Sequence, residues 1–148
     1  MIFRELDYGS NEYKDACSLR DQVLRTPLGL RLGETDLQGE EDQLHFGGWD
    51  EDGILIACVI AVPQSEAVVK IRQMAVATEH QGLGIGRELM AALHTELESR
   101  GWNQFVLNAR AYAVGFYAKL GYCPVGVEFM EVGIPHLRMD RESGLTGI

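Results

Sequence analysis

Three alternating glycines, set between a strand pattern and a helix pattern, constrain this chain more than any other feature. The run reads Gln81-Gly82-Leu83-Gly84-Ile85-Gly86-Arg87. Glycine has no Cβ, so the backbone here can approach a ligand closely. The first N–H groups of a helix have no intrahelical partner and lie at the positive end of the helix dipole. A strand, a glycine loop and a helix start in this order predict a binding site for a pyrophosphate.

The loop differs from the two commonest phosphate-binding motifs. Arg87 stands where a dinucleotide-binding G-x-G-x-x-G would have its third glycine, and no acidic residue is suitably placed about 20 residues further on. No Gly-Lys-Ser/Thr follows, so the loop is not a P-loop. A turn that only closes a tight strand-to-helix connection is the structural alternative. Three glycines together with Gln81 and Arg87 favour a ligand site, and a guanidinium suits phosphate geometry.

Hydropathy periodicity places this loop within an α/β pattern. The chain reads as strand, helix and three strands, then helix, strand, helix and two strands, with no repeat and no linker. We therefore expect a single domain over residues 1–148, with a loop or broken helix at 25–42. The expected strands cover residues 2–6, 43–49, 54–62, 68–76, 105–107, 123–127 and 134–140. The expected helices run from a Ser10 cap to about Leu24, from the glycines to Gly101, and over 114–120.

Composition narrows the class of protein. A chain of 148 residues can bury a sizeable core, and its net charge of -9 argues against nucleic acid as a partner. No apolar run approaches the roughly 20 residues of a membrane-spanning helix, and the N-terminus does not read as a secretory signal. We therefore expect a cytoplasmic protein with no membrane partner. The three cysteines are widely spaced, which argues against a disulfide framework or a zinc site; Cys58, in an apolar run, is expected in the core.

Two segments carry a resemblance to a known family. Gln81, Gly84 and Gly86 fit a phosphate loop of the form Gln/Arg-x-x-Gly-x-Gly/Ala, and Asn108 is followed by Phe-Tyr-x-Lys-x-Gly-Tyr over residues 116–122. In these motifs, their order and their spacing, the chain resembles the GNAT superfamily of N-acetyltransferases over about residues 45–140. The resemblance implies a mixed, mostly antiparallel sheet flanked by helices on both faces.

The same resemblance implies a reaction. Acetyl-CoA would be the acyl donor, no metal would be needed, and a primary amine would attack the thioester directly with both substrates bound. The backbone N–H of Val76 would donate to the thioester oxygen, and Tyr117 would be the acid that helps the thiolate leave. The residues implied in cofactor binding are Met74, Ala75, Val76, Gln81, Gly82, Leu83, Gly84, Ile85, Gly86, Arg87, Asn108 and Tyr117.

No motif of the sequence identifies the general base, and the histidines are the candidates. His136 opens the last expected strand, histidine titrates near neutrality, and the stretch from Glu128 to His136 resembles a subgroup of GNAT proteins. We take His136 as the catalytic or substrate-binding candidate, with a structural role as the alternative. His45 could line the acceptor cleft through water, whereas His94 is expected on the helix surface.

Several alternatives stay open. A non-catalytic acyl-CoA-binding or regulatory module would keep the same fold, and a cysteine enzyme using Cys123 would need an adjacent base that is not evident. The acceptor, a small-molecule or peptide amine, is unidentified, and a homodimer is plausible by the resemblance. Five acids in the expected loop could face a cationic amine or simply solvent: Glu34, Asp36, Glu40, Glu41 and Asp42.

Overall fold

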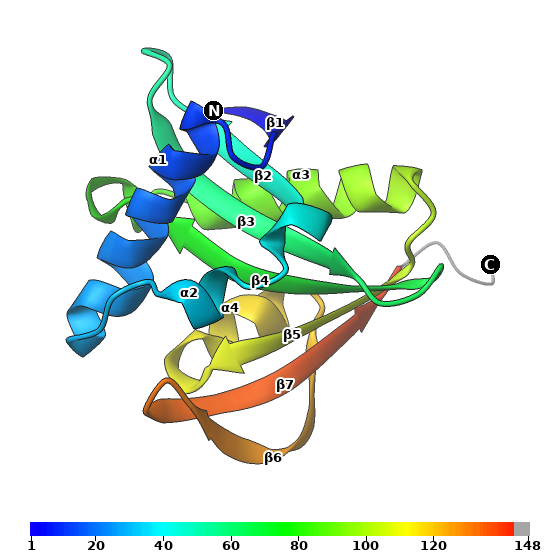
Figure 1. Ribbon diagram of the computed structural model, residues 1–148. Helices are drawn as coiled ribbons and strands as arrows, with labels where there is room; N and C mark the ends of the chain where they lie inside the picture. Colours follow the sequence, from blue (N-terminus) through cyan, green and yellow to red (C-terminus); the bar gives the residue numbers. More distant parts are fainter. Residues whose placement is uncertain (144–148) are drawn as a thin grey trace. The chain divides into compact units, whose positions relative to one another are not determined.

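The computed structural model describes residues 1–143, and within them the strands have the order β1-β2-β3-β4-β5-β7-β6 (Figure 1). Strands β4 and β5 are parallel, whereas β1–β2, β2–β3, β5–β7 and β6–β7 are antiparallel. The implied α/β fold with a mixed, mostly antiparallel sheet is therefore confirmed. The strands are β1 (Ile2–Leu6), β2 (Leu44–Trp49), β3 (Leu55–Pro63), β4 (Val68–Val76), β5 (Gln104–Arg110), β6 (Cys123–Glu131) and β7 (Ile134–Glu142).

The helices lie where the sequence places them, with one region more broken than the rest. Residues 25–42, expected as a loop or broken helix, contain three short helical pieces. The α-helices are α1 (Asn11–Arg20), α2 (Glu34–Leu37), α3 (Ile85–Ser99) and α4 (Val114–Lys119). The other helical turns, of the π or 3-10 type, are η1 (Asp21–Arg25), η2 (Thr26–Leu28), η3 (Glu40–Asp42), η4 (Thr78–His80) and η5 (Ala111–Ala113).

The chain divides into two compact units. Unit 1 combines Met1–Val62 with Gln73–Thr95, and unit 2 combines Pro63–Arg72 with the chain from Glu96 onward. Strand β4 and helix α3 each contribute residues to both units. The glycine loop lies in unit 1, and the second family motif lies in unit 2.

In unit 1, helices cover both faces of β2 and β3, with α1 in front and α3 behind in Figure 1. The Ser10 cap is confirmed, because Ser10 Oγ accepts from the Tyr13 amide at 3.1 Å. After Arg20 the expected helix continues to Arg25 as a π-helical turn rather than as regular α-helix. Tyr13, Ala16 and Leu19 pack into a buried cluster with Leu6, Trp49, Cys58, Ala75 and Ala77.

Two expectations about unit 1 are wrong. Glu40, grouped with the exposed acids, is 0% exposed because it forms an ion pair with buried Arg20. His94, expected on the surface, is 4% exposed. It lies one turn after Met90 and next to Leu93, so the buried stripe of α3 is wider than the apolar spacing alone indicates.

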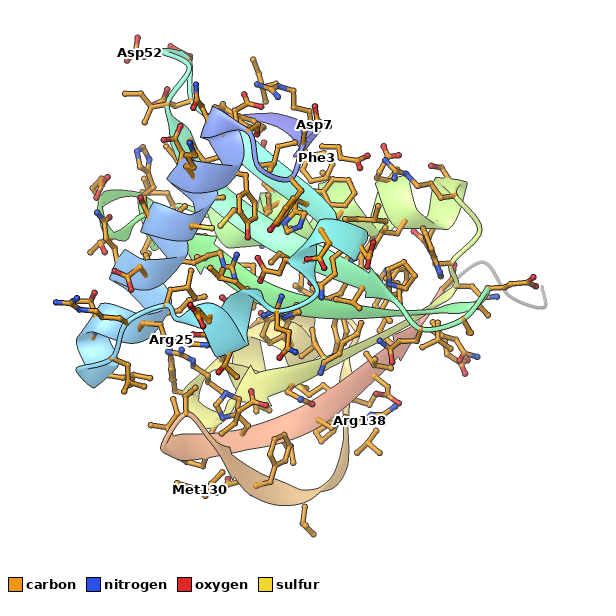
Figure 2. All side chains as sticks on the ribbon, viewed as in Figure 1. Phe3, Asp7, Arg25, Asp52, Met130 and Arg138 are labelled. Carbon is orange, nitrogen blue, oxygen red and sulfur yellow. The ribbon has the colours of Figure 1, made fainter. Side chains whose placement is uncertain are left out.

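Arg25, labelled in Figure 2, donates to Asp36 Oδ1 at 2.7 Å and links η1 to α2.

In unit 2, β5 pairs with β7 along its whole length, from Gln104 opposite Glu142 to Arg110 opposite His136. Strand β5 is therefore longer than the expected 105–107. Strand β6 likewise runs past Val127 to Glu131, with an irregular register between Val125 and Phe129. Gly121, at φ +92°, follows α4 in the left-handed conformation that favours glycine.

Candidate active site

The glycine loop turns the chain from β4 into α3 through two left-handed residues. Gly82 has φ +79° and Gly84 has φ +82°, which a side chain would disfavour. Nothing lies within 4 Å of the position that a Cβ on Gly82 would take. Leu83, between them, is 70% exposed and so contributes no packing to the core. The loop presents its backbone to solvent, as a site for a bound anion requires.

The start of α3 supplies donors. The amide of Glu88 donates to the Gly84 carbonyl at 3.0 Å, so the intrahelical ladder begins there. The preceding amides, those of Ile85, Gly86 and Arg87, lie in the first turn of the helix. N–H groups in a first turn have no carbonyl acceptor within the helix. The Arg87 guanidinium comes within 3.7 Å of the position that a Cβ on Gly84 would occupy. One cation and the positive end of the helix dipole therefore meet at the loop.

The loop is tied to the end of β4 by a side chain. Gln81 Nε2 donates to the Val76 carbonyl at 3.0 Å. The next amide, that of Ala77, donates to the Ile56 carbonyl of β3 at 2.8 Å. Because the N–H and C=O groups of successive strand residues point to alternate edges, the Val76 N–H points away from β3. Met74 is half-buried, while Ala75 and Val76 are buried.

Asn108 lies in unit 2, within β5 rather than at a strand end. It pairs with Arg138 of β7 and is half-buried. Its position differs from the expectation because β7 provides a partner for β5 as far as Arg110. Arg138, labelled in Figure 2, is exposed on β7 and donates to Asp140 at 2.9 Å.

Tyr117 is 9% exposed on α4, packed edge-on against Phe116 and Tyr122 with ring centroids 5.0 and 5.7 Å away. Burial raises the pKa of its hydroxyl to about 12; Tyr112 adds to the rise and Arg110 opposes it. Arg110 also donates to the Tyr112 hydroxyl at 3.2 Å. The Tyr117 hydroxyl therefore stays protonated at neutral pH and can act as a proton donor.

His136 is the third residue of β7 and is 3% exposed. Its Nδ1 lies 3.0 Å from the Ile134 carbonyl, which can only accept, so this nitrogen carries hydrogen. Its Nε2 lies 3.5 Å from Glu131 Oε2, and the ring stacks on Phe129 at 6.0 Å. With Nδ1 donating, Nε2 is the nitrogen that can accept a proton, and a half-exposed carboxylate stands beside it.

His45 and Cys58 have structural contacts, whereas Cys123 does not lie in the core. His45 contacts the Glu40 carbonyl through Nε2 at 2.8 Å and lies edge-on to Tyr13, instead of reaching a cleft through water. Cys58 is 2% exposed, as expected for the core, and burial raises its pKa to about 12. Cys123 is exposed.

Arg20 and Gln73 form a contact that no pattern in the sequence indicates. Gln73, within β4, has φ +56°, a left-handed value rare for a side-chain residue, and its Oε1 accepts from Arg20 Nε at 2.9 Å. The period-two pattern of residues 68–76 carries no signal of this interruption.

Among residues 1–143, no three His, Cys, Asp or Glu side chains gather as a metal site would need. No helix in that range is long and apolar enough to cross a membrane.

Comparison with known proteins gives a consistent result. Residues 31–143 match the family model described as Acetyltransferase (GNAT) domain. The chain is 38% identical over 132 residues to the Bacillus subtilis protein named Uncharacterized N-acetyltransferase YjcF, covering 88% of this chain and 93% of that protein.

Two solved structures share the fold. The crystal structure of Escherichia coli ElaA has a TM-score of 0.80 at 25% identity, covering 95% of this chain and 99% of that one. An aminoglycoside 6'-N-acetyltransferase complexed with coenzyme A has a TM-score of 0.74 at 20% identity, covering 96% and 97%. At this identity, the similarity to the aminoglycoside 6'-N-acetyltransferase concerns the fold alone.

Because the pKa of Tyr117 is raised in the folded protein, the free energy of unfolding should decrease at high pH. The folded protein keeps a proton that the unfolded chain releases at the usual tyrosine pKa of about 10. Stability from this shift is fully present below about pH 10 and is lost as the pH rises through about 12. In a tyrosinate absorbance titration, we expect Tyr117→Phe to remove an ionisation near pH 12. Loss of one near pH 10 instead would contradict a buried hydroxyl.

Proposed function

The chain belongs to the GNAT family of acetyltransferases, and from this we propose that it transfers an acetyl group from acetyl-CoA to a primary amine, with both substrates bound together. The family supports acyl transfer from CoA to an amine. The observation that carries the proposal is the loop at 81–87, where two left-handed glycines, the first turn of α3 and Arg87 come together. Each part of that loop suits a pyrophosphate.

The residues of unit 1 fit a CoA thioester. In the proposal, the pyrophosphate is bound by the backbone and side chains of residues 81–87, with Gln81 also holding the strand end. The pantetheine arm pairs with the backbone of Met74, Ala75 and Val76, along the edge that faces away from β3. Acetyl-CoA supplies the acetyl group as an activated thioester.

Val76 is the proposed oxyanion donor. Its N–H points away from β3, and its carbonyl is held by Gln81 at 3.0 Å. This contact and the bond from Ala77 to β3 fix the peptide plane that follows Val76, so the residue that carries the donor is anchored on that side before a substrate arrives. A donor fixed in advance stabilises charge that develops on the thioester oxygen without reorganising during the reaction.

Tyr117 is the proposed general acid, and Asn108 the proposed contact to the cofactor arm; both are carried over from the family motif. A thiol has a pKa of about 8.5, so its thiolate leaves more readily beside a proton donor. The pKa of Tyr117, about 12, keeps its hydroxyl protonated throughout the range in which the thiolate leaves.

His136 is the proposed general base. An amine that binds as an ammonium ion must lose a proton before it attacks. Nδ1 donates to the Ile134 carbonyl, which leaves Nε2 to accept that proton, and the Glu131 carboxylate 3.5 Å away stabilises the imidazolium that forms.

The acceptor is proposed only as a primary amine of a small molecule or peptide. Two of the five acids that could face a cationic amine form ion pairs within the protein, since Glu40 pairs with Arg20 and Asp36 with Arg25.

The proposed domain covers residues 1–148, of which 144–148 lie outside the described residues. The family match supports one domain because it spans residues of both units. We further propose a cytoplasmic location.

Removal of the Tyr117 hydroxyl tests the acid. We expect Tyr117→Phe to lower kcat by roughly 10²- to 10⁴-fold, the usual contribution of a positioned acid, with little change in KM for acetyl-CoA. The assay is thiol release over a panel of primary amines, and Tyr8→Phe, at an exposed tyrosine, is the control. Unchanged turnover in Tyr117→Phe would rule out the acid role. Acetyl-CoA binding without turnover by the wild type would favour the non-catalytic module.

Replacement of His136 tests the base. His136→Gln keeps a hydrogen-bonding side chain but cannot take up a proton at neutral pH. We expect kcat/KM at neutral pH to fall by roughly 10²-fold or more. The deficit should shrink as the assay pH rises, because more of the acceptor amine is then neutral without help. Thermal unfolding serves as the control for folding. A variant as active as the wild type at neutral pH would exclude this role.

A further inference from the structure

Strand β4 contains a residue whose backbone no ordinary strand would adopt. Gln73 has φ +56°, in the left-handed region that L side chains rarely occupy. Such a residue within a strand interrupts the alternation of its side chains, as a bulge does. Left-handed side-chain residues persist only where surrounding contacts hold them, and they concentrate at functional sites. The structure shows which contacts hold Gln73.

Arg20, at the end of α1, supplies those contacts. Its Nε donates to Gln73 Oε1 at 2.9 Å. Its two terminal nitrogens donate to the two carboxylate oxygens of Glu40, at 2.8 and 2.6 Å. Arg20 is 1% exposed and Glu40 is 0% exposed. Each of the three guanidinium nitrogens therefore has a hydrogen-bond partner, which fixes the plane of the group and the point from which Nε reaches Gln73.

Glu40 is itself held in place. Tyr13 donates its hydroxyl to Glu40 Oε1 at 2.7 Å, and burial, with help from Glu40, raises the pKa of Tyr13, so the hydroxyl remains a donor. His45 contacts the Glu40 backbone carbonyl at 2.8 Å. The Glu40 carboxylate is thus positioned from α1 and its backbone from β2, and Arg20 is positioned by the carboxylate.

Stability alone is a poor reason for this arrangement. A buried ion pair is often no more stabilising than well-packed apolar side chains of similar volume, because both charges lose their hydration. The bond from Arg20 Nε to Gln73 lies outside this ion pair. It reaches the residue directly before Met74–Val76, the segment whose far end is held by Gln81 at the Val76 carbonyl. Ala75, between these two contacts, packs in the cluster that contains Ala16 and Leu19.

We propose that Arg20 and Glu40 are positioning residues that act through Gln73 to set the direction of the backbone at Met74–Val76. This inference rests on the proposed function, in which the Val76 N–H is the oxyanion donor. A misdirected donor weakens stabilisation of the transition state more than binding of the ground state. In the proposal the pyrophosphate is bound by residues 81–87, and only the pantetheine arm pairs with Met74–Val76. Affinity for the cofactor should therefore fall much less than turnover when the network is cut.

The test compares three variants with the wild type. Gln73→Met removes the acceptor but leaves the Arg20–Glu40 pair in place. The double variant Arg20→Met with Glu40→Met removes both buried charges and so avoids leaving one unpaired. Arg100→Met breaks the exposed pair with Glu96 and is the control. We expect kcat to fall roughly 10- to 100-fold in the first two, as misplacement of a reacting group does. The Kd for CoA should stay within about 3-fold of the wild type, and the control should be unchanged.

A second readout does not depend on turnover. Amide hydrogen exchange measured by NMR should be at least roughly 10-fold faster at Met74–Val76 in Gln73→Met, with exchange in α3 unaffected. If the wild type proves inactive but this acceleration is seen, the proposed function fails and the positioning network stands. Unchanged exchange at Met74–Val76 would overturn the network. So would a double variant, which lacks the Arg20 donor to Gln73, whose kcat matches that of the wild type.

Discussion

The hydrogen bond from Gln81 to the Val76 carbonyl is the contact on which the rest of the candidate site depends. At 3.0 Å it joins the last residue of β4 to the first residue of the glycine loop. It therefore fixes two things together: the edge of the strand and the entry into the left-handed turns at Gly82 and Gly84. The turn between them, in which the amide of His80 donates to the Ala77 carbonyl at 2.8 Å, and the buried face of α3 connect the same parts. The Gln81 side chain adds the direct contact to the residue whose N–H is the proposed oxyanion donor.

The loop could be predicted from sequence because its chemistry is local. Glycines at 82, 84 and 86 permit one kind of backbone, and a helix start has donors wherever it occurs. The Ser10 cap and the span of β4 were predicted for the same reason. Gln73 and Glu40 could not be predicted, since their conformation and burial depend on Arg20, far from both in the sequence. The length of β5 likewise depends on its partner β7.

The net charge of the molecule and the local charges at the glycine loop have opposite effects on an anionic ligand. The net charge of -9 would repel an anionic cofactor at a distance. At short range, the first turn of α3 and the Arg87 guanidinium offer donors that an anion can bind. Elsewhere, the ionisable groups with proposed roles are buried: Tyr117 is 9% exposed and His136 is 3% exposed. Burial keeps the first protonated, and the hydrogen bond from Nδ1 to the Ile134 carbonyl orients the ring of the second.

Calorimetric titration of acetyl-CoA into the purified protein tests most directly whether residues 81–87 bind its pyrophosphate. Gly84→Glu would place a carboxylate at the loop, and Gly53→Glu makes the same change at an open left-handed glycine, φ +78°, between β2 and β3. We predict micromolar binding by the wild type and by Gly53→Glu, and none by Gly84→Glu. Equal binding by all three proteins, or by none, would contradict the assignment of the loop.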